Sequence, residues 1–131
     1  MIIRAALAYF GIVFACAFMA GTVRVLLVAP AVGALAAVVI EMPLILVISW
    51  LMAAWVIARF HVAARMGARL AMGGWAFAIL MLAEAGLALV AFGTPWPVYV
   101  AELATAPGVL GLAGQIAFAL VPALRLAILR R

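Results

Sequence analysis

Four polar side chains lie at nearly the same depth in four otherwise apolar stretches of the sequence. They are Arg24, Glu41, Glu84 and Gln115, and each lies roughly 6 to 10 residues from one end of its stretch, or about 9 to 15 Å along a helix. A charged residue at the centre of a membrane helix costs about 2.5 to 3.5 kcal/mol on insertion scales. We therefore expect these side chains to face one another or water, and they form the intramembrane polar cluster on which any chemistry of this chain depends.

Arg24 and Glu41 are the first candidate pair in this cluster. If the first two stretches form a helical hairpin, the two positions differ by about 7 Å along the helix axis, which an extended arginine can cover. This predicts a structural ion pair, with snorkelling of Arg24 toward the lipid headgroups as the alternative. Glu41 also precedes Pro43, so it is either a carboxyl beside a helix kink, as in transporters with broken helices, or a capping group at the start of a shorter helix.

Glu84 adds a second carboxyl near the one guanidinium of the cluster. Two carboxyls beside one cation in a medium of low dielectric should not both ionise, so the pair can bind a proton. The same arrangement is also consistent with an inert buried network or with contact to a ligand. Gln115 is expected to form a cross-helix hydrogen bond, worth about 1 kcal/mol in membranes. We expect the layer to be dry, because apart from Gln115 only Thr22 is placed to line a wet cavity there.

The apolar stretches that carry these residues are long enough to cross a membrane, which takes about 20 residues in a helix. Pro30 is expected to end the first helix, since proline cannot continue the hydrogen-bond ladder, and Pro107 is expected in the first turn of the fourth. Residues 98–105 are expected to form a short interfacial helix anchored by Trp96 and Tyr99. The four expected spans are residues 5–29, 31–58, 70–92 and 107–124.

The placement of the arginines predicts the orientation of these spans. Seven of the eight arginines fall on one side of a four-span arrangement, and only Arg24 lies toward the other. The positive-inside rule then places both termini, and the link between the second and third spans, in the cytoplasm. The seven are Arg4, Arg59, Arg65, Arg69, Arg125, Arg130 and Arg131.

Composition predicts a membrane protein and leaves no room for a second, soluble domain. Apolar residues make up 74% of the 131 residues and charged residues 8%, against about 25% charged residues in soluble domains. We therefore expect residues 1–131 to form a single transmembrane domain. The net charge of +5 then reflects orientation signals at the ends of spans and not a nucleic-acid surface.

Cysteine and histidine add no site. Cys16 is the only cysteine, so no intrachain disulfide can form. The segment Ala15-Cys16-Ala17 resembles a signal-peptide cleavage site, but the apolar stretch continues past it, which favours a retained span. His61 is the only histidine and cannot by itself supply a haem or zinc site. With no hydrolase triad or metal motif, we expect no catalytic residue, no metal, no cofactor and no enzymatic activity.

These observations predict an all-α integral membrane protein, a four-helix antiparallel bundle with short loops. Abundant Ala, Gly, Val, Leu and Arg are typical of GC-rich bacterial genomes, so the expected location is the bacterial inner membrane. The expected function is an accessory or scaffolding subunit that contacts the lipid bilayer and a membrane-protein partner, or a second copy, through small-residue faces such as Gly74 and Ala78. The alternative is a proton-coupled small-molecule carrier or channel subunit that uses Arg24, Glu41 and Glu84. A water-accessible cavity that reaches the polar cluster favours the carrier, whereas dry packing favours the scaffold.

Overall fold

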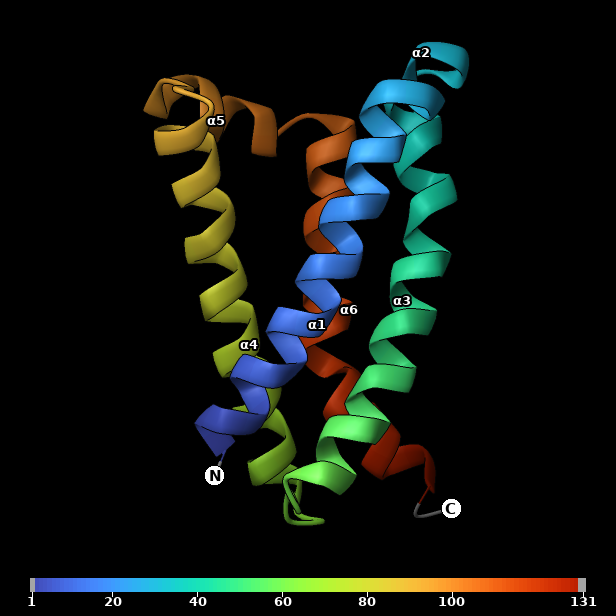
Figure 1. Cartoon of the computed structure of the whole chain (residues 1–131), viewed down its shortest axis with the longest axis vertical. Coiled ribbons are helices and arrows are strands. Elements are labelled where there is room, and N and C mark those ends of the chain that lie inside the picture. Colours follow the sequence, from blue (N-terminus) through green and yellow to red (C-terminus); the bar gives the residue numbers. More distant parts are fainter. Residues whose placement is uncertain (1, 130–131) are drawn as a thin grey trace.

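The computed structural model describes residues 2–129 and is helical almost throughout. Four helical segments are long and apolar enough to cross a membrane, namely Ile2–Val32, Ala34–Arg59, Met66–Ala91 and Ala106–Leu129. The prediction of an all-helical chain with four long apolar helices is confirmed, and the chain is consistent with a small multi-pass membrane protein. In chain order (Figure 1), the elements are α1 (Ile2–Val23), the π-helix η1 (Arg24–Val28), α2 (Ala29–Val32), α3 (Ala34–Arg59), α4 (Met66–Gly86), the π-helix η2 (Leu87–Ala91), α5 (Trp96–Leu103) and α6 (Ala106–Leu129).

The two ends of the molecule carry different elements. The start of α1, the link between α3 and α4, and the end of α6 lie together at the lower end in Figure 1. We call this the arginine end. The opposite end carries α2 and α5, and we call it the α5 end. The described arginines of the arginine end are Arg4, Arg59, Arg65, Arg69 and Arg125, whereas Arg130 and Arg131 lie outside the described residues.

The first span ends later than predicted. Pro30 does not end it, because Pro30 lies in the first turn of α2 and the helical path continues from α1 through η1 into α2. Pro30 directly follows the π-helical turn η1 and Ala29, and π-bulges and prolines are both places where a helix departs from the regular backbone hydrogen-bond ladder. The chain instead reverses at Gly33, whose φ of +90° is a backbone conformation that residues with a Cβ rarely adopt.

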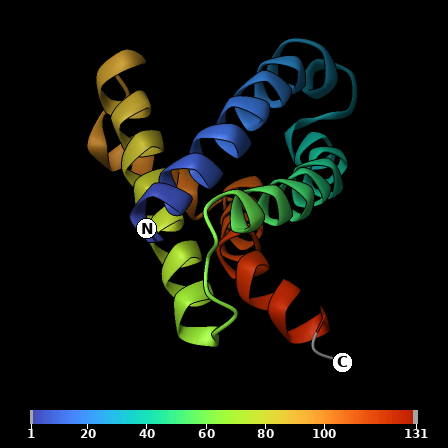
Figure 2. The ribbon, with the colours of Figure 1, turned by 60° about the horizontal axis from the view of Figure 1, so that its bottom comes forward.

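The hydrophobic core is confined to the arginine end. Its fully buried side chains include Tyr9, Val56 and Met72, which come from three different helices. In the half of the molecule toward the α5 end, residues 14–48 contain one buried residue, Ala37, and residues 81–115 contain none. The helices therefore pack at one end and diverge toward the other, as the separation of α1 from α4 shows in both views (Figure 1 and Figure 2).

One glycine permits the closest approach of α4 to α6. A Cβ on Gly73 would lie 1.7 Å from the carbonyl oxygen of Ala119, so no larger residue fits without moving a helix. The predicted small-residue pair on the adjacent face is exposed instead: Gly74 and Ala78 face away from the core. A Cβ on Gly74 would meet nothing within 4 Å. Gly74 and Ala78 therefore form no interface within the chain, and the predicted contact of this face with a partner or a second copy stays a prediction.

Two arginines join helices at the arginine end. Arg69 is 8% exposed, and its guanidinium donates hydrogen bonds to the carbonyls of Ala63, at 3.2 Å, and Pro122, at 3.4 Å. Arg125 donates to the carbonyl of Trp50 at 3.2 Å and lies 4.7 Å from the centre of the same indole ring. These contacts tie α4 to α6 and α6 to α3 where the core is packed.

Candidate functional site

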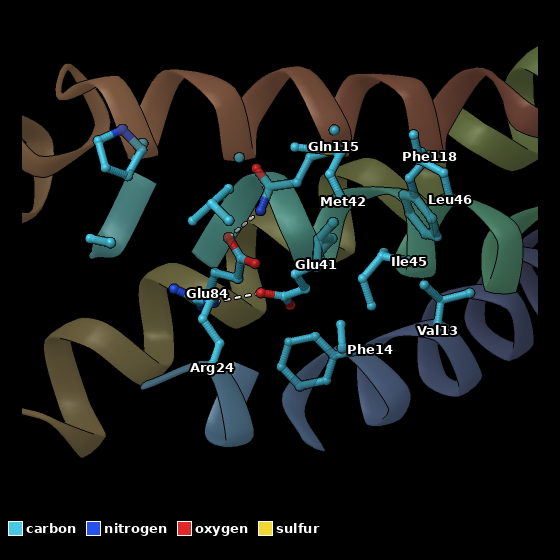
Figure 3. A pocket seen from close by; sticks show the side chains of 18 of the residues that line it. Val13, Phe14, Arg24, Glu41, Met42, Ile45, Leu46, Glu84, Gln115 and Phe118 are labelled. Carbon is cyan, nitrogen blue, oxygen red and sulfur yellow. Dashed lines mark hydrogen bonds and ion pairs between the residues drawn. The ribbon is translucent and has the colours of Figure 1, made fainter. Parts of the chain in front are cut away.

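A cavity of about 490 Å³ lies between the diverging helices (Figure 3). Its volume falls in the range of about 300 to 1,000 Å³ that is typical of small-molecule sites. The four residues of the predicted polar cluster, Arg24, Glu41, Glu84 and Gln115, all line it. The structure therefore brings one polar side chain from each of the four spans to a single space. The other walls are mostly apolar and include Phe10, Val13, Phe14, Met42, Ile45 and Phe118.

Arg24 forms an ion pair with Glu41 across the hairpin of the first two spans. Its Nε lies 2.5 Å from Oε2 of Glu41, and the two side chains are 32% and 18% exposed. Within the described residues this Nε makes no directed hydrogen bond, so the contact is ionic. Arg24 is also the first residue of η1, and π-helical segments are wider than α-helices and frequent at functional sites.

Glu84 and Gln115 connect the other two spans. The side-chain amide of Gln115 donates a 2.5 Å hydrogen bond to Oε2 of Glu84. This is the cross-helix bond that the sequence predicts for Gln115. The amide is neutral, so it satisfies the carboxylate without balancing its charge. Among residues 2–129, no cation forms an ion pair with Glu84, which distinguishes it from Glu41.

Glu102 is a cavity residue that the sequence did not reveal. It lies in α5 at the α5 end, is exposed, and lines the same cavity. The sequence places it in the segment 98–105 between the third and fourth spans, outside every apolar stretch, and so gives no reason to group it with the polar cluster. All three acidic residues of the chain therefore line one cavity.

The turn between α5 and α6 holds Glu102 over the cavity. The hydroxyl of Thr105 donates to the carbonyl of Glu102 at 2.6 Å and accepts from the N–H of Gly108 at 3.2 Å. A Cβ on Gly108 would lie 2.2 Å from that same carbonyl, so the turn requires glycine. Tyr99 lies in α5, as Glu102 does. Burial and, secondarily, the charge of Glu84 raise the pKa of the Tyr99 phenol above its usual value. α5 is thus electrostatically linked to the polar cluster.

The floor of the cavity is closed by an aromatic pair. Phe118 lines the cavity, and its ring stacks on that of Tyr9 with centroids 4.4 Å apart. The hydroxyl of Tyr9 donates a 2.7 Å hydrogen bond to the carbonyl of Phe118. This carbonyl lies four residues before Pro122, whose missing N–H leaves it without an intrahelical donor. The buried Ser49 hydroxyl also interacts with the phenol of Tyr9, so three helices meet at the floor.

The expectation of close packing at this layer is wrong, because the polar cluster borders a cavity that extends to the α5 end, whereas the expectation that the layer is dry stays a prediction. The physical reason is the one-sided core, which holds the helices together below the cluster and leaves them apart above it. Three carboxyls and one guanidinium in an apolar cavity can bind a cation, exchange a proton, or do both. Among the described residues, no group of three or more His, Cys, Asp or Glu side chains is arranged to hold a metal ion. Comparison of the chain with protein-family models, curated proteins and solved structures finds no match.

Proposed function

We propose that this chain is a proton-coupled carrier of a small molecule in the bacterial inner membrane, with four antiparallel spans and both termini in the cytoplasm. The observation that carries this proposal is the cavity of about 490 Å³, since all three acidic side chains of the sequence and Arg24 line it and its volume is typical of small-molecule sites. A proton-coupled carrier needs one ionisable group for which a ligand and a proton compete. The cavity offers such a group in an otherwise apolar environment.

Glu84 is the group that we assign to proton exchange. Glu41 is already paired with Arg24, whereas Glu84 is supported by the neutral amide of Gln115. That amide can donate to an oxygen of the carboxylate or to the carbonyl oxygen of the protonated acid. Glu84 can therefore gain or lose a proton without losing its support. The other charged or titratable groups that line the cavity or act on Glu84 are Arg24, Glu41, Glu102 and Tyr99.

The expected orientation assigns a direction to the cavity. The positive-inside rule puts the arginine end in the cytoplasm, so the α5 end faces the opposite side of the membrane. The cavity then opens outward and is closed inward by the stacked rings of Tyr9 and Phe118. This arrangement corresponds to the outward-facing state of a carrier, and transport requires the floor to open.

The test is proton movement across the membrane of liposomes that contain the purified chain and a trapped pH-sensitive dye. Cationic, anionic and neutral compounds are added outside in turn. At least one class should move protons through the wild type, and Glu84→Gln should abolish this movement. Trp75→Phe, on an exposed position of the same helix away from the cavity, should retain it. If no class of compound moves protons through the folded wild type, the carrier function is refuted.

A second candidate, the accessory subunit, is favoured by the low burial of the spans. Only 6% to 28% of the residues in the most apolar window of each span are buried within the chain. The remaining apolar surface is free to contact lipid, a second copy or another membrane protein. A protein that co-purifies in fixed ratio in mild detergent, together with no proton movement in liposomes, would assign the accessory role.

A further inference from the structure

A second opening leads sideways from the polar cluster. This cavity of about 470 Å³ shares with the first the residues Phe14, Ala17, Arg24, Glu41 and Glu84. Its remaining lining comes from α1, η1, η2 and Phe92, which directly follows η2, and no described residue of α5 or α6 contributes. It therefore opens between α1 and α4, on the side where these helices diverge (Figure 2). We call it the lateral opening.

The rim of the lateral opening is apolar and faces outward. Phe18, Leu26 and Phe92 on this rim are 51%, 67% and 72% exposed. η1 packs against α3 and η2 packs against α5, so the two π-helical segments lie on opposite sides of the opening. In a bilayer, acyl chains surround this rim. A molecule dissolved among those chains can reach Glu84 without first crossing water.

We propose, on the premise that the carrier function holds, that the ligand is an amphiphilic cation with a single alkyl tail. It enters from the bilayer through the lateral opening and places its charged head beside Glu84. The tail lies along the apolar walls of the lateral opening, and the head reaches the point that the two cavities share. Phe14, which lines both cavities, offers a ring face that a quaternary ammonium group can contact.

The charges of the cavity favour a cation over an anion. Glu41, Glu84 and Glu102 bring three carboxyls, whereas Arg24 brings one positive charge. Because Arg24 already contacts Glu41, an anion would have to separate that pair. A cation meets Glu84, which makes no ion pair among the described residues. A charge taken out of water is tolerated only where such a partner is present.

Proton exchange at Glu84 then keeps the net charge of the cavity constant when the ligand binds. When the cationic head arrives, Glu84 releases its proton to the aqueous phase and becomes the carboxylate partner of the head. One positive charge replaces another, so the net charge of the cavity is unchanged. When the head leaves, Glu84 takes up a proton again.

The first test is equilibrium binding to the full chain in lipid nanodiscs, with empty nanodiscs as the background. Decyltrimethylammonium, decyl sulfate and decanol share a tail and differ in the charge of the head. Saturable binding is expected for the cationic probe only. Glu84→Gln, which can still accept the hydrogen bond of Gln115, should weaken this binding at least about tenfold, because one member of a desolvated charge pair is lost.

The result that overturns the proposed ligand class is equal binding of the anionic or neutral probe, or unchanged affinity in Glu84→Gln. Neither result decides whether the chain is a carrier, which the liposome experiment with the full panel of compounds tests separately. If anionic or neutral compounds move protons there and cations do not, the ligand class is wrong and the carrier stands. If no compound moves protons, the carrier function itself fails.

The second test concerns the route. Ala88→Trp fills the lateral opening from η2, and Ala78→Trp places the same side chain on an exposed position of α4 that lines neither cavity. Ala88→Trp should slow association of decyltrimethylammonium on the order of tenfold relative to Ala78→Trp, an effect on the rate of entry. Association of tetramethylammonium, which has no tail and enters from the α5 end, should be unchanged.

A second blocking variant distinguishes a blocked opening from misfolding of Ala88→Trp. Leu26 is 67% exposed on the opposite side of the lateral opening, so Leu26→Trp narrows the opening without disturbing the core. It should slow the tailed cation in the same way as Ala88→Trp. Association rates in both variants equal to that of Ala78→Trp would refute the lateral route.

Discussion

Removing the hydroxyl of Tyr9 tests how the floor of the cavity is held closed. Tyr9 is 0% exposed, and its hydroxyl supplies the 2.7 Å hydrogen bond to the carbonyl of Phe118. Tyr9→Phe leaves that carbonyl buried without a donor, because Pro122 has no N–H to offer it. The expected loss of stability is about 1 kcal/mol, between the average of about 0.6 and the maximum of about 1.7 measured for hydrogen bonds in a membrane protein. The two rings, 4.4 Å apart, can stay stacked, so the change isolates the hydroxyl.

A double-mutant cycle with Pro122→Ala tests the cause. Alanine restores an N–H at position 122, which can bond to the carbonyl of Phe118 within α6. Loss of the Tyr9 hydroxyl should then destabilise the protein less than in the wild-type background, with a coupling energy of about 1 kcal/mol. The interaction of Tyr9 with Ser49 is lost in both backgrounds and cancels in the cycle.

The measurement is reversible unfolding in mixed micelles as the fraction of sodium dodecyl sulfate rises, followed by helicity. Tyr99→Phe is the matched control, because Tyr99 lies in α5 away from the core, and its effect should stay within about 0.5 kcal/mol. If the effects of Tyr9→Phe and Pro122→Ala add to within about 0.3 kcal/mol, Tyr9 does not serve the carbonyl that Pro122 frees.

Three further predictions concern the ion pair, the helix interface and the orientation. Arg24→Ala should destabilise the protein more than Arg24→Ala combined with Glu41→Ala, because the single change strands a carboxylate. Such losses reach about 3 to 5 kcal/mol for fully buried pairs and should be smaller here, since both side chains retain some exposure; equal losses on unfolding would exclude the pairing. Gly73→Ala should cost about 1 to 3 kcal/mol through overpacking against Ala119, whereas Gly74→Ala has open space, so equal melting temperatures would argue against the close contact of α4 and α6. Reporter fusions to the C-terminus and to the loop before α5 should give opposite signals in cells, and the same signal at both sites would contradict the four-span orientation.

Hydropathy was sufficient to predict the long helices, because apolar stretches of this length have few other solutions in a membrane. The residue at which the first helix ends was harder to predict from the sequence. Pro30 was expected to end the first helix, yet a proline in a first turn is compatible with helix, and Gly33 makes the reversal. Both residues are poor helix formers, and only the backbone conformation shows which of them the chain uses to turn.

The polar cluster could be located from the sequence because its charges stand out against apolar neighbours. The pairing of Arg24 with Glu41 followed from their depths in adjacent spans. The cavity could not be predicted, because in uniformly apolar spans no periodicity shows which face packs. The contrast between Gly73 and Gly74 illustrates this limit, since the two neighbours are chemically identical and only one meets α6. Glu102 was missed because only the path of α5 brings it over the cavity.

The one-sided core couples this protein to the mechanics of the bilayer. If the chain crosses a bilayer as proposed, it occupies more area in the leaflet at the α5 end, because the helices pack at the arginine end and diverge at the α5 end. Lateral pressure among the acyl chains of the wider leaflet then presses α1 and α4 toward each other, against the cavity. Lipids with small headgroups and crowded chains raise this pressure and favour the narrower shape, whereas loosely packed chains favour the wider one. The proposed membrane arrangement therefore implies that lipid composition changes the width of the cavity, and that it has to be held constant when binding is compared between variants.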